Sequence, residues 1–480
     1  MIMSKRPLCT FVALALLTVS SQAIFDETNI DQWEKPTEKG PDKEAPGFLM
    51  NLGPTGARAT LTENTFVVKH VFDQSPAKGQ LQLEDVITGI AGKPFNKHTF
   101  GKCYGMKSGN GLEGPVMDFG TAIEQAEGKD GKLVLDVTRE GKPIQVTVKL
   151  EAIGKFSPTF PFHCKKSEKL ANDAMDYLMK NQSERSGAVH EKGIYGLALL
   201  AHDKNREAKE LAHSWNEMPG EKQWTWWPSY QCIFLSEYYL QTRDRRVLET
   251  IGKLCERLYL SQVINPDDYK NAMHGGQPQA KNFLKGGNGH GARIAGYGTM
   301  TITTLMAILS WELAEDCGID IKDFNRDIAY ECVHTHTHES GYMGYRFATG
   351  AYTPVGRQGL SLITHHVSQR KGSEEHVKNV TKGLVTAKTR INDGHGCNTL
   401  AWCWALIGAQ LAEEKAMREF YDYNKAFINM ARTHDGAFVV TPGRNRHEKG
   451  YYMSPRVQPT AAMAIALKAD KPKLRIQGGK

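Results

Sequence analysis

One stretch of the chain combines side chains that can exchange protons with side chains that can bind an anion. It covers residues 286–315 and reads GGNGHGARIAGYGTMTITTLMAILSWELAE. If this stretch is helical from about His290, then His290, Arg293 and Tyr297 lie on one face, because each is three or four residues from the next. Its apolar residues form a separate stripe, made of Ile302, Leu305, Leu309 and Leu313. This pattern predicts a helix that lines a cavity.

Two later segments carry side chains of the same types. His395 and Asn398 lie in NDGHGCN, and Arg444 and Arg446 lie in PGRNRH. A histidine and a tyrosine can supply the base and the acid of a β-elimination, so we expect a catalytic set of His290, Tyr297 and His395. Amides, guanidinium groups and aromatic faces suit an anionic sugar polymer. The expected substrate-binding residues are Asn288, Arg293, Trp226, Trp227, Asn398, Arg444 and Arg446.

The same residues have a structural interpretation. The ends of every helix leave backbone groups without helical partners, and polar side chains in the connecting loops can cap those groups. The catalytic interpretation is favoured for His290, Tyr297 and His395.

A run of histidines, HTHTHE at residues 334–339, raises the question of a metal site. On a helix only His334 and His338 share a face, and zinc needs a third ligand from elsewhere, such as His395 or Cys397. A solvated helix end is the preferred interpretation, so we predict no metal ligand and no cofactor. The chain also lacks the motifs G-x-S-x-G, H-E-x-x-H and G-x-x-x-x-G-K-[ST], and an aspartate-rich D-x-D-D motif of terpenoid cyclases.

The elements that must position these residues are helices, which follow one another from Pro161 onward. Some segments, such as 399–409, are apolar nearly all round, whereas others, such as 415–432, are highly charged. Glycine-containing connections precede the apolar helices at intervals of roughly fifty residues. This alternation favours a closed α/α ring over an ordinary bundle. The predicted helices cover residues 168–181, 194–202, 229–242, 246–261, 292–315, 321–335, 358–369, 374–389, 399–413, 415–432 and 459–469.

The segment from 46 to 152 has short β-rich runs instead. It contains SPA at 75–77, DVI at 85–87, GKP at 92–94 and a hairpin across TREGK. A short helix is predicted over 121–127. The order of these motifs resembles a bacterial PDZ domain, which binds the ends of extended peptides at a sheet edge. Pro54 lies where a loop would hold the peptide carboxylate and has no N–H to donate, so a docking role is the alternative to peptide binding.

A family resemblance covers nearly the whole mature chain. GHGARIAGYG at 289–298, GHGCNTLAWCWALIGA at 394–409 and THDGAFVV at 433–440 resemble an uncharacterised family of exported bacterial proteins. These proteins pair a PDZ-like domain with an α/α-toroid of the terpenoid cyclase and prenyltransferase type. The resemblance implies a multidomain fold, with a small β-rich PDZ-like domain followed by a large all-α toroid, and it implies no reaction.

The N-terminus predicts export. Lys5 and Arg6 precede an apolar run and a small-residue cleavage site near Ala23, as in a secretory signal peptide, and the run is too short for a membrane anchor. The predicted divisions are a signal peptide at 1–23, a linker at 24–45, the PDZ-like domain at 46–152 and the toroid at 161–480. A net charge of +7, spread along the chain, gives no reason to expect nucleic-acid binding.

Cysteines fit export less simply. Cys232, Cys255 and Cys403 lie in apolar helical segments and resemble small buried hydrophobic residues. The spacing leaves room for one or two disulfides and assigns no partners.

Two functions follow from these observations. The first is an exported, periplasmic or secreted, carbohydrate-active protein, a polysaccharide lyase or a glycoside hydrolase, with its site at the mouth of the toroid. The second is a non-catalytic scaffold that binds a peptide end at the PDZ-like groove or a glycan at the ring. The two differ at His290 and His395, which an enzyme would place beside another titratable group around an open space.

Overall fold

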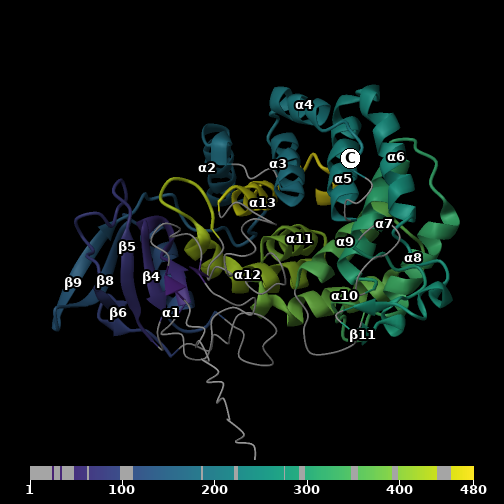
Figure 1. Ribbon diagram of the computed structural model, residues 1–480. Coiled ribbons are helices and arrows are strands. Elements are labelled where there is room, and N and C mark those ends of the chain that lie inside the picture. Colours follow the sequence, from purple (N-terminus) through teal and green to yellow (C-terminus); the bar gives the residue numbers. More distant parts are fainter. Residues whose placement is uncertain are drawn as a thin grey trace, which may run out of the picture.

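The computed structural model has a β-sheet module followed by a large helical module (Figure 1). This order confirms the predicted fold class. The structure describes residues 24–25, 33–34, 48–61, 64–97, 112–184, 188–220, 225–274, 276–290, 298–347, 355–391, 398–439 and 456–479.

The first module is built on an antiparallel sheet of seven strands within the described residues, in the order β3-β4-β5-β6-β8-β9 with β7 paired to β6. Glu140 and Gly141 connect β8 to β9. Both residues have positive φ, 50° and 77°, which matches a two-residue hairpin turn. The predicted hairpin is therefore confirmed. The strands are β3 (Phe48–Asn51), β4 (Ala57–Leu61), β5 (Phe66–Val71), β6 (Val86–Ile90), β7 (Lys93–Pro94), β8 (Lys132–Arg139) and β9 (Lys142–Lys149).

Helix α1 (Pro115–Glu127) covers this sheet and is longer than the predicted segment 121–127. Proline at the first helical position suits a helix start, because its missing N–H has no helical partner there. Phe119 packs edge-on against Phe66 with ring centroids 5.6 Å apart, and Ile123 is fully buried. The helix therefore packs on the sheet through one face, and its other face contacts α12 (Glu414–Ala431) of the helical module.

The second module is a closed ring of inner helices. Each inner helix contacts the next inner helix in the sequence. The last inner helix, α13, contacts the first, α3, which closes the ring. This closure confirms the predicted ring and excludes an open bundle. The inner helices are α3 (Val189–Ala201), α5 (Trp226–Thr242), α7 (Thr301–Asp316), α9 (Gly356–Ser368), α11 (Asn398–Gln410) and α13 (Val457–Leu467).

An outer layer surrounds the inner helices (Figure 1). The outer helices alternate with the inner ones in the sequence, so each inner–outer pair forms one hairpin of the ring. Helix α4 was missed by the sequence analysis because its ten residues carry few apolar side chains. The outer helices are α2 (Lys165–Lys180), α4 (Asn205–Ser214), α6 (Leu248–Tyr259), α8 (Asp323–Thr335), α10 (Glu374–Thr386) and α12 (Glu414–Ala431).

Two glycines bring α9 and α11 into close contact. A Cβ atom at Gly359 would lie 2.0 Å from the carbonyl oxygen of Trp404, and one at Gly408 would lie 2.2 Å from the carbonyl oxygen of Gly359. No side chain fits at these distances, so glycine is required for the two backbones to meet.

The prediction for the start of α7 was wrong. The helix begins at Thr301, and Thr299 just before it forms an isolated β-bridge with Gly289. His290 is therefore not on this helix, and Arg293 and Tyr297 lie outside the described residues. Thr304 Oγ1 donates to the carbonyl oxygen of Met300 at 2.8 Å and accepts from the backbone N–H of Asn288 at 2.8 Å, which fixes the first turn.

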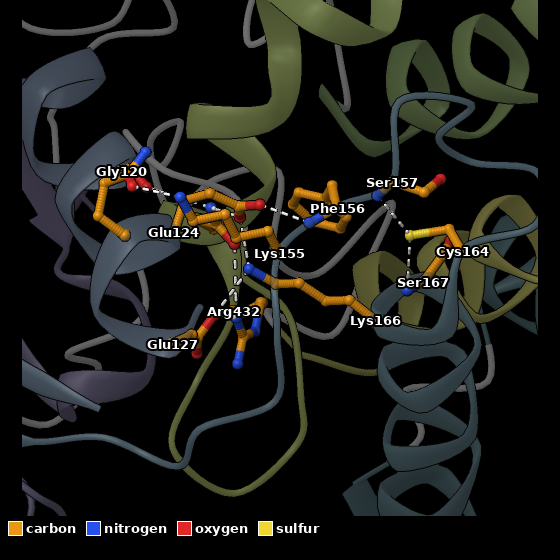
Figure 2. A network of polar contacts seen from close by, with 12 residues as sticks. Gly120, Glu124, Glu127, Lys155, Phe156, Ser157, Cys164, Lys166, Ser167 and Arg432 are labelled. Carbon is orange, nitrogen blue, oxygen red and sulfur yellow. Dashed lines mark hydrogen bonds and ion pairs between the residues drawn. The ribbon is translucent and has the colours of Figure 1, made fainter. Parts of the chain in front are cut away.

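A buried ion cluster joins the sheet module to the ring (Figure 2). Lys166, at the start of α2, has a side chain with no exposed surface, and its Nζ contacts Glu124 Oε2 and lies 2.8 Å from Glu127 Oε2. Arg432 Nη1 lies 2.9 Å from the same Glu127 oxygen. Asn429 Nδ2 donates to Glu124 Oε2 at 3.0 Å. Two cations and two carboxylates from α1, α2 and the end of α12 thus balance one another.

The described cysteines are free thiols, and all are buried: Cys164, Cys232, Cys255, Cys317, Cys332 and Cys403. Cys232 and Cys255 come closest, with sulfur atoms 3.9 Å apart, well beyond the length of a disulfide bond. The prediction that Cys232, Cys255 and Cys403 are small buried hydrophobic residues is confirmed. Cys103 and Cys397 lie outside the described residues.

The remaining strands are short pairs. β1 (Ile24–Phe25) pairs with β2 (Trp33–Glu34) inside the predicted linker, and β10 (Met273–His274) pairs with β11 (Gln277–Pro278). None of the helices in the described part of the chain combines the length and the apolar composition that crossing a membrane requires.

Candidate functional site at the amino-terminal end of the ring

The inner helices bring their first residues to one end of the ring. Contacts between α5 and α7 advance in the same direction along both helices: Ser310 Oγ donates to the carbonyl oxygen of Ser229, and Cys317 Sγ, two turns later, donates to that of Ser236. The two helices are therefore parallel. Side chains that begin neighbouring inner helices can meet at this end.

An aromatic cluster occupies this end. His190 is the second residue of α3, Trp226 is the first residue of α5, and Tyr230 lies one turn further along α5. The His190 ring lies 5.3 Å from Trp226 and 5.0 Å from Tyr230, measured between ring centroids. His290, in the loop before α7, lies 6.2 Å from Trp226 by the same measure. His190 and Tyr230 are buried, while Trp226 and His290 are partly exposed.

Below this cluster the ring is filled. Tyr230 on α5 and Trp404 on α11 are fully buried, and their ring centroids lie 6.1 Å apart. These helices are three steps apart in the ring, on opposite sides, so the contact crosses the centre. Aromatic side chains from opposite helices therefore meet inside the ring beneath Trp226.

A hydrogen bond fixes the tautomer of His290. Trp226 Nε1–H donates to His290 Nδ1 at 3.0 Å. The indole N–H can only donate, so His290 Nδ1 carries a lone pair and the proton of the neutral ring is on Nε2. In this state His290 is a hydrogen-bond donor through Nε2, and it is not a base at that atom.

The backbone at His290 also closes a loop. Its carbonyl oxygen accepts from the backbone N–H of Thr225, and Thr225 Oγ1 donates to the carbonyl oxygen of Gly289 at 2.6 Å. These bonds tie the segment before α7 to the start of α5. His290 is thus held beside Trp226 by main-chain contacts as well as by its ring.

His190 is a poor proton acceptor at neutral pH. Burial lowers its pKa from an ordinary 6.5 to about 3, because the charged imidazolium would lose its hydration. A general base works best with a pKa near the operating pH. His190 therefore contributes a neutral ring to the cluster.

The side chain of Asn288 forms hydrogen bonds inside the fold. Its side chain is fully buried, and Nδ2 donates to the carbonyl oxygen of Leu258 at 3.0 Å and to Ser261 Oγ at 2.9 Å. The residue joins the end of α6 to the loop before α7, which differs from the substrate-binding role expected for it. Trp227 is partly exposed and packs against the core.

The other predicted site residues cannot be placed from the structure. Asn398 begins α11, and its side chain is outside the described part. The rest lie outside the described residues altogether: Arg293, Tyr297, His395, Arg444 and Arg446.

Three histidines that the sequence analysis did not combine do come together elsewhere in the ring. His334, His365 and His376 place one ring nitrogen each within 4.8 Å of the others, and they form a group that can hold a metal ion. Only His334 belongs to the histidine run considered for metal binding. His336 and His338 follow the end of α8, where their Nδ1 atoms contact the carbonyl oxygen of Cys332 and Ser340 Oγ.

Comparison with known proteins gives a family and no activity. Residues 167–478 match the model of a domain of unknown function, DUF6288. This match begins within α2 and ends after α13, so it covers the helical ring. None of the curated proteins compared with the chain matches it.

Proposed function

The chain belongs to the DUF6288 family, and on that premise we propose that it is an exported carbohydrate-active protein that holds an anionic polysaccharide at the amino-terminal end of its ring. The observation that carries this proposal is the partly exposed Trp226, which packs beside the buried ring of His190 and donates a hydrogen bond to the partly exposed His290. Flat aromatic faces can pack on the apolar faces of sugar rings, and a small number of polar atoms beside them can set the orientation.

The chemistry at this end divides between two kinds of residue. His290 offers Nε2–H to a sugar oxygen or a uronate carboxylate, because Trp226 occupies its Nδ1. In a lyase or a hydrolase, Tyr297 and His395 supply the groups that transfer protons. Arg293, Arg444 and Arg446 neutralise the carboxylates of the polymer.

The test is a screen of the purified chain against uronate-containing and neutral polysaccharides, with two readouts. Tryptophan fluorescence measures binding, and the absorbance of the unsaturated uronate or the release of reducing ends measures reaction. Trp226→Ala removes the aromatic face and is expected to weaken binding by about tenfold or more, the effect of truncating an aromatic side chain that a ligand covers. Binding that is unchanged in Trp226→Ala contradicts the proposed site.

Two further variants separate the roles of the cluster. Trp226→Phe keeps an aromatic face and removes the N–H that fixes the His290 tautomer, so it is expected to retain binding and to change the reaction. His290→Ala is expected to abolish product formation. His163→Asn is the matched control, since His163 has an exposed side chain and a positive φ that asparagine also tolerates. Full activity in His290→Ala rules out its catalytic assignment.

The second candidate is a non-catalytic scaffold that binds glycan at the same place. The loop-closing bonds of His290 and Gly289 to Thr225 favour it, because they give this segment a structural role. For this candidate the screen yields binding without product for every polymer, and His290→Ala affects affinity and stability alone.

For the sheet module, which resembles a PDZ domain, we favour a docking role over capture of a peptide end. The loop expected to hold a carboxylate includes η2 (Gly53–Thr55), which is buried and contacts α12. Asn51 Nδ2 donates to the carbonyl oxygen of Met430 at 2.6 Å. A peptide with a free C-terminus is then expected not to bind the intact chain, and saturable binding in fluorescence anisotropy would show the opposite.

A further inference from the structure

The three histidines come from three consecutive helices. His334 lies near the end of α8, His365 near the end of α9, and His376 near the start of α10. The ring centroids of His334 and His376 lie 4.2 Å apart, and those of His365 and His376 lie 4.6 Å apart. One ring nitrogen from each residue lies within 4.8 Å of the other two. This cluster is separate from the aromatic cluster around Trp226.

The hydrogen bonds around His365 direct one of its nitrogens at His334. His365 Nδ1 lies 2.7 Å from the carbonyl oxygen of Ser361, which can only accept, so Nδ1 carries the proton. The Nε2 atom then presents a lone pair, and His334 Nε2 lies 2.8 Å from it. A histidine whose second nitrogen donates to a backbone carbonyl is the arrangement usual for metal ligands, because it fixes the tautomer and the ring orientation.

The pKa of each of the three imidazoles is lowered. Burial is the main cause, and it lowers the pKa of His365 to about 4 and that of His376 to about 2. Burial also lowers the pKa of His334, and the nearby Arg370 acts in the same direction.

We propose that His334, His365 and His376 bind one divalent transition-metal ion, with zinc as the ion that three imidazoles suit best. Zinc bound at tetrahedral angles to three histidines sets its nitrogen ligands about 3.3 Å apart. The 2.8 Å separation of His334 and His365 must therefore widen by about half an ångström, with a tilt of the rings, as the metal takes the place of the proton between them and that proton moves to Nδ1 of His334.

The surroundings leave room for a fourth ligand. His365 borders a surface pocket together with Gln369, Arg370 and Ser373, so water can reach the site from this side. Arg370 is a nearby cation, and its charge is offset by Asp327, 2.8 Å from its Nη1. Three protein ligands with one position open to water is the pattern of catalytic zinc sites, whereas structural sites have four protein ligands.

The test is metal titration of the full chain after treatment with a chelator. Isothermal titration with zinc is expected to show one site in the original protein, and the cobalt-substituted protein is expected to show the visible absorption of a tetrahedral ion. His365→Gln and His376→Gln each remove a ligand and approximately keep its volume, so both are expected to weaken binding by about tenfold to a hundredfold or more. His338→Gln, which changes an exposed histidine of the same run, is the matched control and is expected to bind zinc as the original protein does.

A variant with a lower stability could bind less zinc for that reason alone. The melting temperature of each protein is therefore measured with and without zinc. Zinc is expected to raise the melting temperature of the original protein and of His338→Gln and to leave His365→Gln unchanged. Absence of binding in the original protein overturns the proposal and leaves the cluster a hydrogen-bonded trio. Equal affinity in the original protein, His365→Gln and His376→Gln also overturns it, because the metal then binds elsewhere.

Discussion

The ion cluster between the sheet module and the ring makes a strong prediction for Lys166→Met. Methionine keeps the apolar stem that lies near the Phe156 ring and removes the ammonium group, which sits 4.3 Å from the centre of that ring. Within the described residues, Glu127 then keeps Arg432 as its ion-pair partner, and Glu124 has lost its partner Lys166 (Figure 2). The change tests whether this cluster holds the two modules together.

The magnitude follows from the burial of the partners. Removing one member of a buried ion pair costs about 3–5 kcal/mol, because the remaining charge has lost its hydration without compensation. Glu124 keeps two neutral donors, the backbone N–H of Phe156 and Asn429 Nδ2. The lower end of the range, about 3 kcal/mol, is therefore expected for Lys166→Met.

Guanidinium unfolding followed by circular dichroism measures this loss. With a denaturant slope of about 2–6 kcal/mol per molar, a loss of about 3 kcal/mol lowers the midpoint by roughly 0.5–1.5 M. Lys169→Met is the matched control on the same helix, since Lys169 is half-buried and pairs with Asp173 at i,i+4. A pair of that kind contributes about 0.3–0.5 kcal/mol.

A second variant tests the electrostatic cause. Adding Glu127→Gln to Lys166→Met removes one of the stranded charges, so the double variant is expected to recover about 1–2 kcal/mol relative to the sum of the single effects. If Lys166→Met unfolds at the same midpoint as Lys169→Met, the reasoning about buried charge is refuted. If both single effects simply add, the two residues do not interact.

Three other substitutions have clear outcomes. Burial raises the pKa of Glu237 from 4.5 to about 7, so the folded protein binds more protons than the unfolded chain between these values. The contribution of Glu237 to stability is therefore present below about pH 4.5 and falls by about 3 kcal/mol as the pH rises through about 7. Compared with the original protein, Glu237→Gln should be more stable at pH 8 than at pH 4.5 in unfolding titrations. Asn288→Ala is expected to lower the melting temperature, because the carbonyl group of Leu258 loses its donor, and a change in polysaccharide affinity alone would contradict this role. Gly408→Ala is expected to cost about 1–3 kcal/mol in denaturant unfolding, since its Cβ would collide with the backbone of Gly359, and an unchanged midpoint would show that the two helices can separate freely.

Local pattern was sufficient for most elements. The hairpin between β8 and β9 follows from a glycine turn between alternating strands, and its two turn residues have the positive φ that such a turn needs. Helix α11 was expected from its apolar composition and is found as an inner helix, with Trp402 and Trp404 fully buried. These features depend on neighbours in the sequence, so the sequence contains the information for them.

Spacing alone misled at α7. His290, Arg293 and Tyr297 have the spacing of a helix face, but the helix begins at Thr301. Glycines in this stretch remove the preference for helical φ and ψ, and Gly298 has a φ of 103°. A regular spacing therefore predicts a helix only where the residues between the spaced positions also favour one.

The sequence by itself determined the two-module organisation, because the change from period-two to helical patterns at about residue 161 is local. Tertiary structure alone decided which polar residues meet. His365 and His376 are isolated histidines on separate helices, and they join His334 only because the ring brings the ends of α8 and α9 and the start of α10 together. Tertiary packing likewise buries Asn288, a predicted substrate-binding residue, and joins its side chain to the end of α6. Contacts between helices distant in sequence are set by the summed burial of the whole ring, which no short stretch encodes.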